Sequence, residues 1–227
     1  MKKVIYSRYD KSLIAGLPTL RFPGRIEVVL SAEQSARAVT YLLSQDILGV
    51  DTETRPSFHR GETHTLSLLQ VSSRDVCFLF RVKHTGMNEH VLSLLEDTTV
   101  PKIGLSLSDD MTMLHRACVA AHARTFKPGW FIDLQKHVNE IGVEDLSLQK
   151  LYANFFGQKI SKAQRLSNWD ADVLSDKQKA YAATDAWSCI MLYEELMRLE
   201  RTKDYELVKV YDDIQDSNPQ EGQGGEP

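Results

Sequence analysis

The sequence has little that is typical of membrane-spanning, secreted or nucleic-acid-coating proteins. Its longest apolar runs, such as Val76 to Phe80, fall far short of the roughly 20 residues that a membrane helix needs. The start, Met1-Lys2-Lys3-Val4, has no apolar stretch leading to a cleavage site. We therefore expect a cytoplasmic protein that has no membrane contact. The net charge of −4 argues against coating nucleic acid by bulk attraction, although a local basic stripe could still guide a phosphate backbone.

Cysteine is also scarce, with three residues that are widely spaced: Cys77, Cys118 and Cys189. An odd number at this spacing suits neither a disulfide framework nor a thiolate zinc site, so we expect reduced thiols. A glycine-rich phosphate loop is missing after the first predicted strand, which argues against a nucleotide-binding oxidoreductase.

The chain of 227 residues is long enough for one α/β domain with extensions. Residues 1–22 mix charges, glycine and proline without periodicity, which predicts an N-terminal arm. A domain then spans 23–200, and a C-terminal extension spans 201–227. From about residue 212 the extension is nearly free of apolar residues, which predicts disorder.

Short β-like runs alternate with helical patterns, and this alternation predicts an α/β layer fold. The predicted strands cover 26–30, 47–53, 65–71, 76–82, 101–105 and 130–134. The three consecutive runs between 47 and 82 favour adjacent antiparallel pairing. Two helices are predicted over 88–96 and 148–155. Two more are predicted to begin at Ser31 and near Ser108, the latter as N-cap. A last long helix begins with a capping box, Ser175 and Gln178.

Acidic residues interrupt the hydrophobic elements at three places, where their burial would be costly without a neutralising charge. In the first, Asp51-Thr52-Glu53, alternate side chains of a strand share one face, so the two carboxylates can share a cation. A solvated strand end explains this triplet equally well.

The second place is Asp109-Asp110, at the predicted start of a helix, where carboxylates also compensate the helix dipole without any metal. The third is Tyr181 and Asp185, four residues apart and therefore on one helical face. A surface pair would explain the third place alone. Together, the three places supply four oxygen ligands and a phenol at the ends of core elements, which favours a metal site.

These three motifs, in this order, resemble the DEDD superfamily of 3′-5′ exonucleases, and the tyrosine resembles its DEDDy, or ribonuclease D-like, branch. The segments 166–169 and 174–178 are also similar to that branch, and the resemblance spans about 25–199. In the second motif, the apolar Met111 and Leu114 favour Asp110 over Asp109 as the family aspartate. The matched segments are Val50-Asp51-Thr52-Glu53-Thr54, Lys102-Ile103-Gly104 through Asp110 to Leu114, and Tyr181 to Asp185.

The resemblance implies a ribonuclease H-like fold, with a mixed five-stranded sheet and helices on both faces, in a stand-alone 3′-5′ exonuclease domain over 23–200. It implies release of nucleoside 5′-monophosphates with two divalent cations, Mg²⁺ or Mn²⁺. By this resemblance Asp51, Glu53 and Asp185 bind one ion, Asp51 bridges to the second, and Asp110 helps to hold that one. Tyr181 orients the attacking water.

The implied partner is a nucleic acid with a free 3′ end, either DNA or RNA. The residues expected to contact it are Thr54 near the terminal 3′ hydroxyl, Arg55 at phosphates, Leu69 and Gln70 at the terminal base, and the basic pair Lys162 and Arg165. Packing in the core is the simpler explanation for Leu69, and also for Trp169, which could otherwise stack on a base.

Two other functions share this fold. A catalytically inactive nucleic-acid-binding or scaffold module remains possible on the sequence alone, although its ligand positions would more often be substituted. The second is a ribonuclease H-like endonuclease or integrase. Tyr181, four residues before Asp185, distinguishes the exonuclease from these enzymes.

Overall fold

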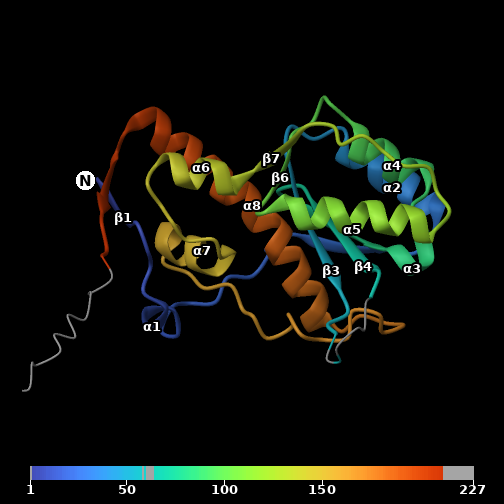
Figure 1. Cartoon of the computed structure of the whole chain (residues 1–227), viewed down its shortest axis with the longest axis horizontal. Coiled ribbons are helices and arrows are strands. Elements are labelled where there is room, and N and C mark those ends of the chain that lie inside the picture. The colour runs from blue at the N-terminus through green and yellow to red at the C-terminus, as the bar shows by residue number, and fades with distance from the viewer. Residues whose placement is uncertain (1, 58, 60–63, 212–227) are drawn as a thin grey trace, which may run out of the picture.

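The computed structural model describes residues 2–57, 59 and 64–211. A mixed sheet with strand order β2-β5-β4-β3-β6-β7 forms its centre (Figure 1). Its six strands confirm the mixed α/β fold, but the resemblance implied five. The six runs predicted as strands from the sequence all form strands, so only the count of five implied by the resemblance was wrong. The strands are β2 (Arg25–Val29), β3 (Leu48–Thr54), β4 (Leu66–Ser72), β5 (Val76–Arg81), β6 (Lys102–Gly104) and β7 (Phe131–Asp133).

The middle of the sheet is the antiparallel meander β3-β4-β5, which confirms the pairing expected for the three consecutive runs. Strand β2 joins β5 in parallel, while β6 and β7 extend the other edge in parallel from β3. Asp51 lies opposite Gln70 in this register, and a register shift follows Glu53. The first acidic motif therefore lies on a central strand.

Helices cover both faces of the sheet, as expected, and each face has its own hydrophobic core. Leu68 and Leu79 lie in the core of one face, while Leu69 and Phe80 lie in the other, as the alternation of a strand requires. The three cysteines are buried and free. The first face is covered by α6 (Leu134–Glu140), α7 (Leu148–Phe156) and α8 (Asp176–Thr202), and the second by α2 (Ala32–Leu42), α4 (Glu89–Glu96) and α5 (Leu107–Ala120).

Helix α8 begins with the predicted capping box, in which the Ser175 side chain accepts from Gln178 N–H and the Gln178 side chain accepts from Ser175 N–H. The helix packs across β3, β4 and β5. It approaches β3 so closely that a Cβ on Gly49 would lie 1.9 Å from the Ala186 carbonyl oxygen. Small residues therefore bring the first and third motifs together.

Helix α5 begins earlier than predicted, because Ser106 rather than Ser108 is its N-cap. Ser106 adopts a left-handed φ of 60°. The Asp133 carboxylate accepts hydrogen bonds from the Ser106 and Leu107 N–H groups at 2.9 and 3.0 Å. A cap supplied from β7, distant in sequence, leaves no local signal, so the prediction was wrong by two residues.

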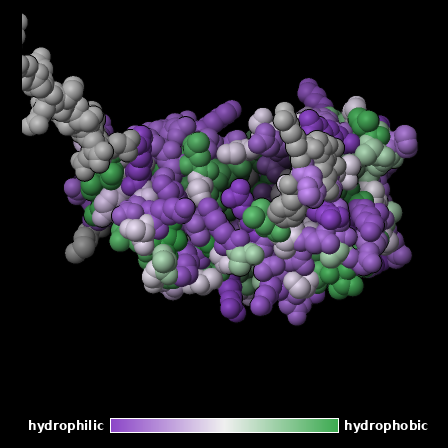
Figure 2. All heavy atoms as spheres, turned by 60° about the horizontal axis from the view of Figure 1, so that its bottom comes forward, coloured by the Kyte–Doolittle hydropathy of each residue, from purple (hydrophilic) through white to green (hydrophobic). Residues whose placement is uncertain are grey.

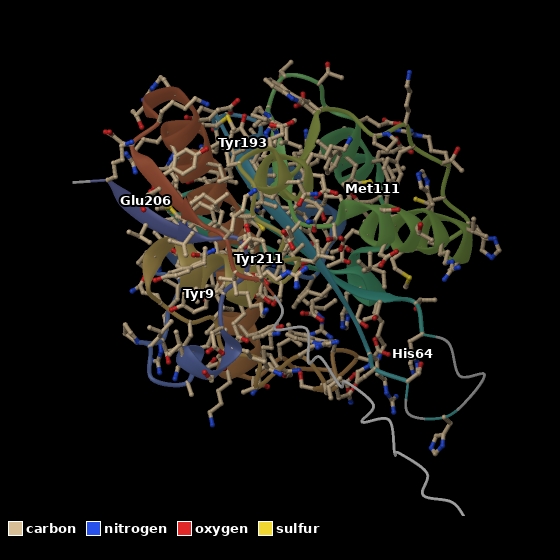
Figure 3. All side chains as sticks on the ribbon, turned by 60° about the vertical axis from the view of Figure 1, so that its left-hand side comes forward. Tyr9, His64, Met111, Tyr193, Glu206 and Tyr211 are labelled. Atoms are coloured by element: carbon tan, nitrogen blue, oxygen red, sulfur yellow. The ribbon has the colours of Figure 1, made fainter. Side chains whose placement is uncertain are left out.

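The ends of the described chain pack together. Strand β1 (Lys3–Tyr6) pairs in parallel with β8 (Tyr205–Val208), and Figure 3 shows Glu206 of β8 beside β1. The arm also contains α1 (Lys11–Ile14), and its Phe22 N–H donates to the Thr184 hydroxyl at 3.0 Å. Residues 2–22 are thus joined to α8 directly before Asp185.

The short helix α3 (Val82–Thr85) completes the elements of the described residues. The predicted disordered segment, 212–227, lies outside those residues. Among the described helices, none is both long and apolar enough to span a membrane.

Candidate active site

Three carboxylates meet between the central strand β3 and helix α8. Asp51 and Glu53 alternate along β3 and project to the α8 side, where Asp185 lies. One oxygen from each of the three lies within 4.8 Å of the others. Asp185 is only 6% exposed, and the two β3 carboxylates are half-buried. The structure thus brings together the first and third motifs.

Asp110 lies beside this group but is not one of the three. Its carboxylate accepts a hydrogen bond from the hydroxyl of Thr52, which lies between the two acidic residues along β3 but projects to the opposite face, toward α5. Asp110 is half-buried, whereas Asp109 is exposed to solvent. The choice of Asp110 over Asp109 as the metal ligand stays a prediction.

The carboxylates are difficult to ionise in this environment. Burial raises the pKa of Asp51 well above its ordinary value, and the neighbouring carboxylates raise it further. Burial raises the pKa of Glu53 to about 8 and that of Asp185 to about 7. It also raises the pKa of Asp110, although the Thr52 hydrogen bond opposes this shift. A nearby cation would reverse these shifts.

Tyr181 lies one helical turn before Asp185 on α8, on the same helical face, and its phenol lowers the pKa of that carboxylate. Burial, followed by the charges of Asp185 and Glu53, raises the pKa of Tyr181 far above its ordinary value. The phenol therefore stays protonated. Its ring packs against Trp169 with centroids 5.9 Å apart, and Trp169 is fully buried. The structure thus confirms packing, rather than base stacking, for Trp169.

Two basic side chains act on the carboxylate group from the segment before α8. The charge of Arg165 lowers the pKa of Glu53, and the charge of Lys162 lowers the pKa of Asp185. Both basic residues are exposed to solvent. The positive charges of these two side chains are therefore accessible to a ligand at the edge of the acidic site.

Comparison with known proteins agrees with this geometry. A family model described as 3′-5′ exonuclease matches residues 26–199. The chain belongs to this 3′-5′ exonuclease family.

Relatives of this exonuclease family include the mouse bifunctional 3′-5′ exonuclease/ATP-dependent helicase WRN, which is 31% identical over 82% of this chain and 14% of its own length. The chain spans 14 to 23% of the length of the first curated relatives that it matches.

The Nibbler EXO domain of Aedes aegypti superposes with a TM-score of 0.70 at 22% identity, over 82% of this chain and 94% of that one. Trypanosoma brucei RNase D, solved with RNA U12, superposes with a TM-score of 0.63 at 22% identity, over 82% of this chain and 64% of that one. These structures share the fold.

The other residues predicted to contact substrate are dispersed around the candidate active site. Thr54 is half-buried at the end of β3, and the exposed Arg55 lines a cleft of about 560 Å³ together with Asn168. Leu69 and Gln70 lie inside the sheet, with 1% and 0% exposure. Thr54 and Arg55 remain predicted contacts, whereas Leu69 and Gln70 would reach a base only if the sheet exposed them.

Sequence reasoning missed side chains that support the segment carrying Arg165. Arg81 is 2% exposed, and its guanidinium donates to the Ala171 carbonyl at 2.5 Å. The Ser67 hydroxyl donates to Asp170 at 2.6 Å. Both donors lie on the sheet and both acceptors in the segment before α8. The only available signal was an arginine at the end of an apolar strand.

The residues present fit a hard divalent cation. The site offers only oxygen donors, which suit Mg²⁺ or Mn²⁺. The Asp185 Oδ1 atom is buried and has no hydrogen-bond partner among the described residues. A bound cation would satisfy this oxygen and would stabilise the charged carboxylates that burial alone disfavours.

Proposed function

We propose that this chain is a metal-dependent 3′-5′ exonuclease, which hydrolyses nucleic-acid phosphodiester bonds from the 3′ end and releases nucleoside 5′-monophosphates. The convergence of Asp51, Glu53 and Asp185 from β3 and α8 carries the proposal. In a family of 3′-5′ exonucleases, such a group is where the reaction would take place. The arm 1–22 and the extension 201–227 would flank a catalytic domain over 23–200.

Two divalent cations, Mg²⁺ or Mn²⁺, would supply activation of water and neutralisation of the leaving 3′ oxygen. Asp51, Glu53 and Asp185 would hold the first cation. Asp51 would be shared with the second, which Asp110 would help to hold from α5.

The phenol of Tyr181 would orient the attacking water through a hydrogen bond. Because the pKa of Tyr181 is raised, the hydroxyl keeps its proton and does not act as a general base. Its packing against the buried Trp169 fixes the position of its ring.

The substrate would be a nucleic acid with a free 3′ end. Lys162 and Arg165 would offset phosphate charge, which the acidic site would otherwise repel. Thr54 would lie near the terminal 3′ hydroxyl, and Arg55 would contact phosphates. The RNA in the complex of Trypanosoma brucei RNase D supports a nucleic-acid substrate. The face of the molecule in Figure 2 is mostly hydrophilic, with hydrophobic side chains in small separate groups, as suits a polar ligand.

The test uses 5′-labelled single- and double-stranded DNA and RNA, incubated with Mg²⁺, Mn²⁺ or a chelator. We expect a product ladder that shortens from the 3′ end only when metal is present. Asp51→Asn and Asp110→Asn should abolish it, while Asp109→Asn, the adjacent exposed carboxylate, should retain most activity.

Cleavage that survives chelation or Asp51→Asn would refute the proposed chemistry. Shortening from the 5′ end would refute the polarity. Binding without cleavage of every substrate would instead favour the inactive nucleic-acid-binding module.

A further inference from the structure

A second group of metal-ligating side chains lies at the other end of α8. His137 and Glu140 come from α6, and Glu200 comes from the last turn of α8. One ligating atom of each lies within 4.8 Å of the others. Figure 1 shows α6 lying along this part of α8. At ~1.5 Å per residue, Glu200 lies roughly 22 Å along the helix from Asp185, so this group is separate from the candidate active site.

The half-buried imidazole of His137 directs one ring nitrogen toward Glu140. Its Nδ1 atom is inaccessible to solvent, has no hydrogen-bond partner among the described residues, and lies 3.4 Å from Glu140 Oε2. The ring meets Tyr193 edge to face, with centroids 5.8 Å apart. A buried ring nitrogen usually has a partner. A metal ion would be a suitable one.

The two carboxylates of the group have few cationic neighbours. Within the described part of the chain, Glu140 forms its ion pair only with His137, and Glu200 forms none. The exposed carboxylates of Glu140 and Glu200 therefore converge beside the imidazole as like charges. A divalent cation would neutralise both carboxylates and coordinate the imidazole.

We propose that His137, Glu140 and Glu200 bind a transition-metal ion of the zinc class. One nitrogen and two oxygen donors, with water in the remaining position, suit Zn²⁺ or Co²⁺. Mg²⁺ prefers oxygen ligands only, so this site differs in metal preference from the carboxylate group at β3. The ion joins α6 to the end of α8, directly before β8, and stabilises the packing of these helices.

The experiment isolates this site in the full chain. The background variant is Asp51→Asn/Asp185→Asn, which removes two ligands of the catalytic group. After treatment with chelator, Co²⁺ is titrated in and followed by its visible absorption and by calorimetry, and Zn²⁺ is used to displace it. His137→Gln and Glu200→Gln are compared with His90→Gln, an exposed histidine on α4.

We expect one Co²⁺ per chain in the background variant, displaced by Zn²⁺ but not by millimolar Mg²⁺. His137→Gln and Glu200→Gln should weaken binding by about tenfold or more, since even loss of a group that only orients a ligand costs 10- to 100-fold. His90→Gln should bind normally. Absence of Co²⁺ binding in the folded background variant, or unchanged affinity in His137→Gln, would overturn the proposal.

Circular dichroism establishes that each variant is folded. If the background variant is unfolded, the Zn²⁺ stoichiometry of the wild-type chain decides instead. It should fall by one in His137→Gln, and an unchanged stoichiometry would refute the site. In either case, His137→Gln should keep its Mg²⁺-dependent exonuclease activity, because the two sites are distinct.

Discussion

At the scale of single residues, Tyr181 shows how one side chain is prepared for one role. It shares a helical face with Asp185, its ring packs on the buried Trp169, and its raised pKa keeps the proton in place. We expect Tyr181→Phe to lower kcat by roughly 10- to 100-fold, since water would lose an orienting partner. KM should change little. Single-turnover kinetics measures this, with Tyr205→Phe on β8 as the control, and an unchanged kcat would exclude the role.

The sequence predicted those residues whose signal is local. Asp51 and Glu53 were placed on one face by the period of a strand, and Tyr181 with Asp185 by the period of a helix. It did not predict that Gln70 is fully buried opposite Asp51, with neither amide atom bonded to a described residue. Nor did it predict the buried Arg81. Their environments depend on strands and segments that are distant along the chain.

At the scale of elements, the site requires that β3 and α8 approach each other closely. A Cβ on Gly49 would lie 1.9 Å from the Ala186 carbonyl oxygen, a backbone atom that cannot move alone. We expect Gly49→Ala to separate the two elements and to lower the free energy of unfolding by about 1–3 kcal/mol, as overpacked cores do. Activity should fall with it, because Asp185 would move away from Asp51.

Urea unfolding and exonuclease assays check this prediction, and Gly16→Ala provides the control, because a Cβ there meets nothing within 4 Å. A fully stable and active Gly49→Ala variant would contradict the close packing of β3 and α8.

Elements built from local patterns were predicted well, and those that need distant partners were not. The capping box of α8 and the meander β3-β4-β5 were identified from sequence. Strands β1 and β8 were missed, because each has four residues and they pair with each other across almost the whole chain. The start of α5 was misplaced for the same reason, since its cap comes from Asp133.

At the scale of the whole molecule, the candidate active site should make stability depend on pH and metal together. In the metal-free protein, the pKa values of Glu53, about 8, and Asp185, about 7, lie above the ordinary values of 4.5 for Glu and 3.8 for Asp. The folded state therefore binds more protons than the unfolded state, and its stability falls as pH rises from about 5 to 8.

Saturating Mn²⁺ should offset this loss, because it stabilises the ionised carboxylates. We expect the rise in Tm on adding Mn²⁺ to be larger at pH 8 than at pH 6 by at least about 3 °C. Asp185→Asn should reduce that difference. Thermal unfolding in chelator and in Mn²⁺ measures it, and an equal rise at both pH values would count against metal binding by these carboxylates.

The central claim is that side chains from β3, α5 and α8 form one metal centre. Anomalous scattering from a crystal soaked in Mn²⁺ together with a nucleoside 5′-monophosphate tests it most directly. We expect two peaks roughly 4 Å apart, one among Asp51, Glu53 and Asp185 and the other between Asp51 and Asp110. A well-ordered crystal with no manganese at any of these carboxylates would contradict the account.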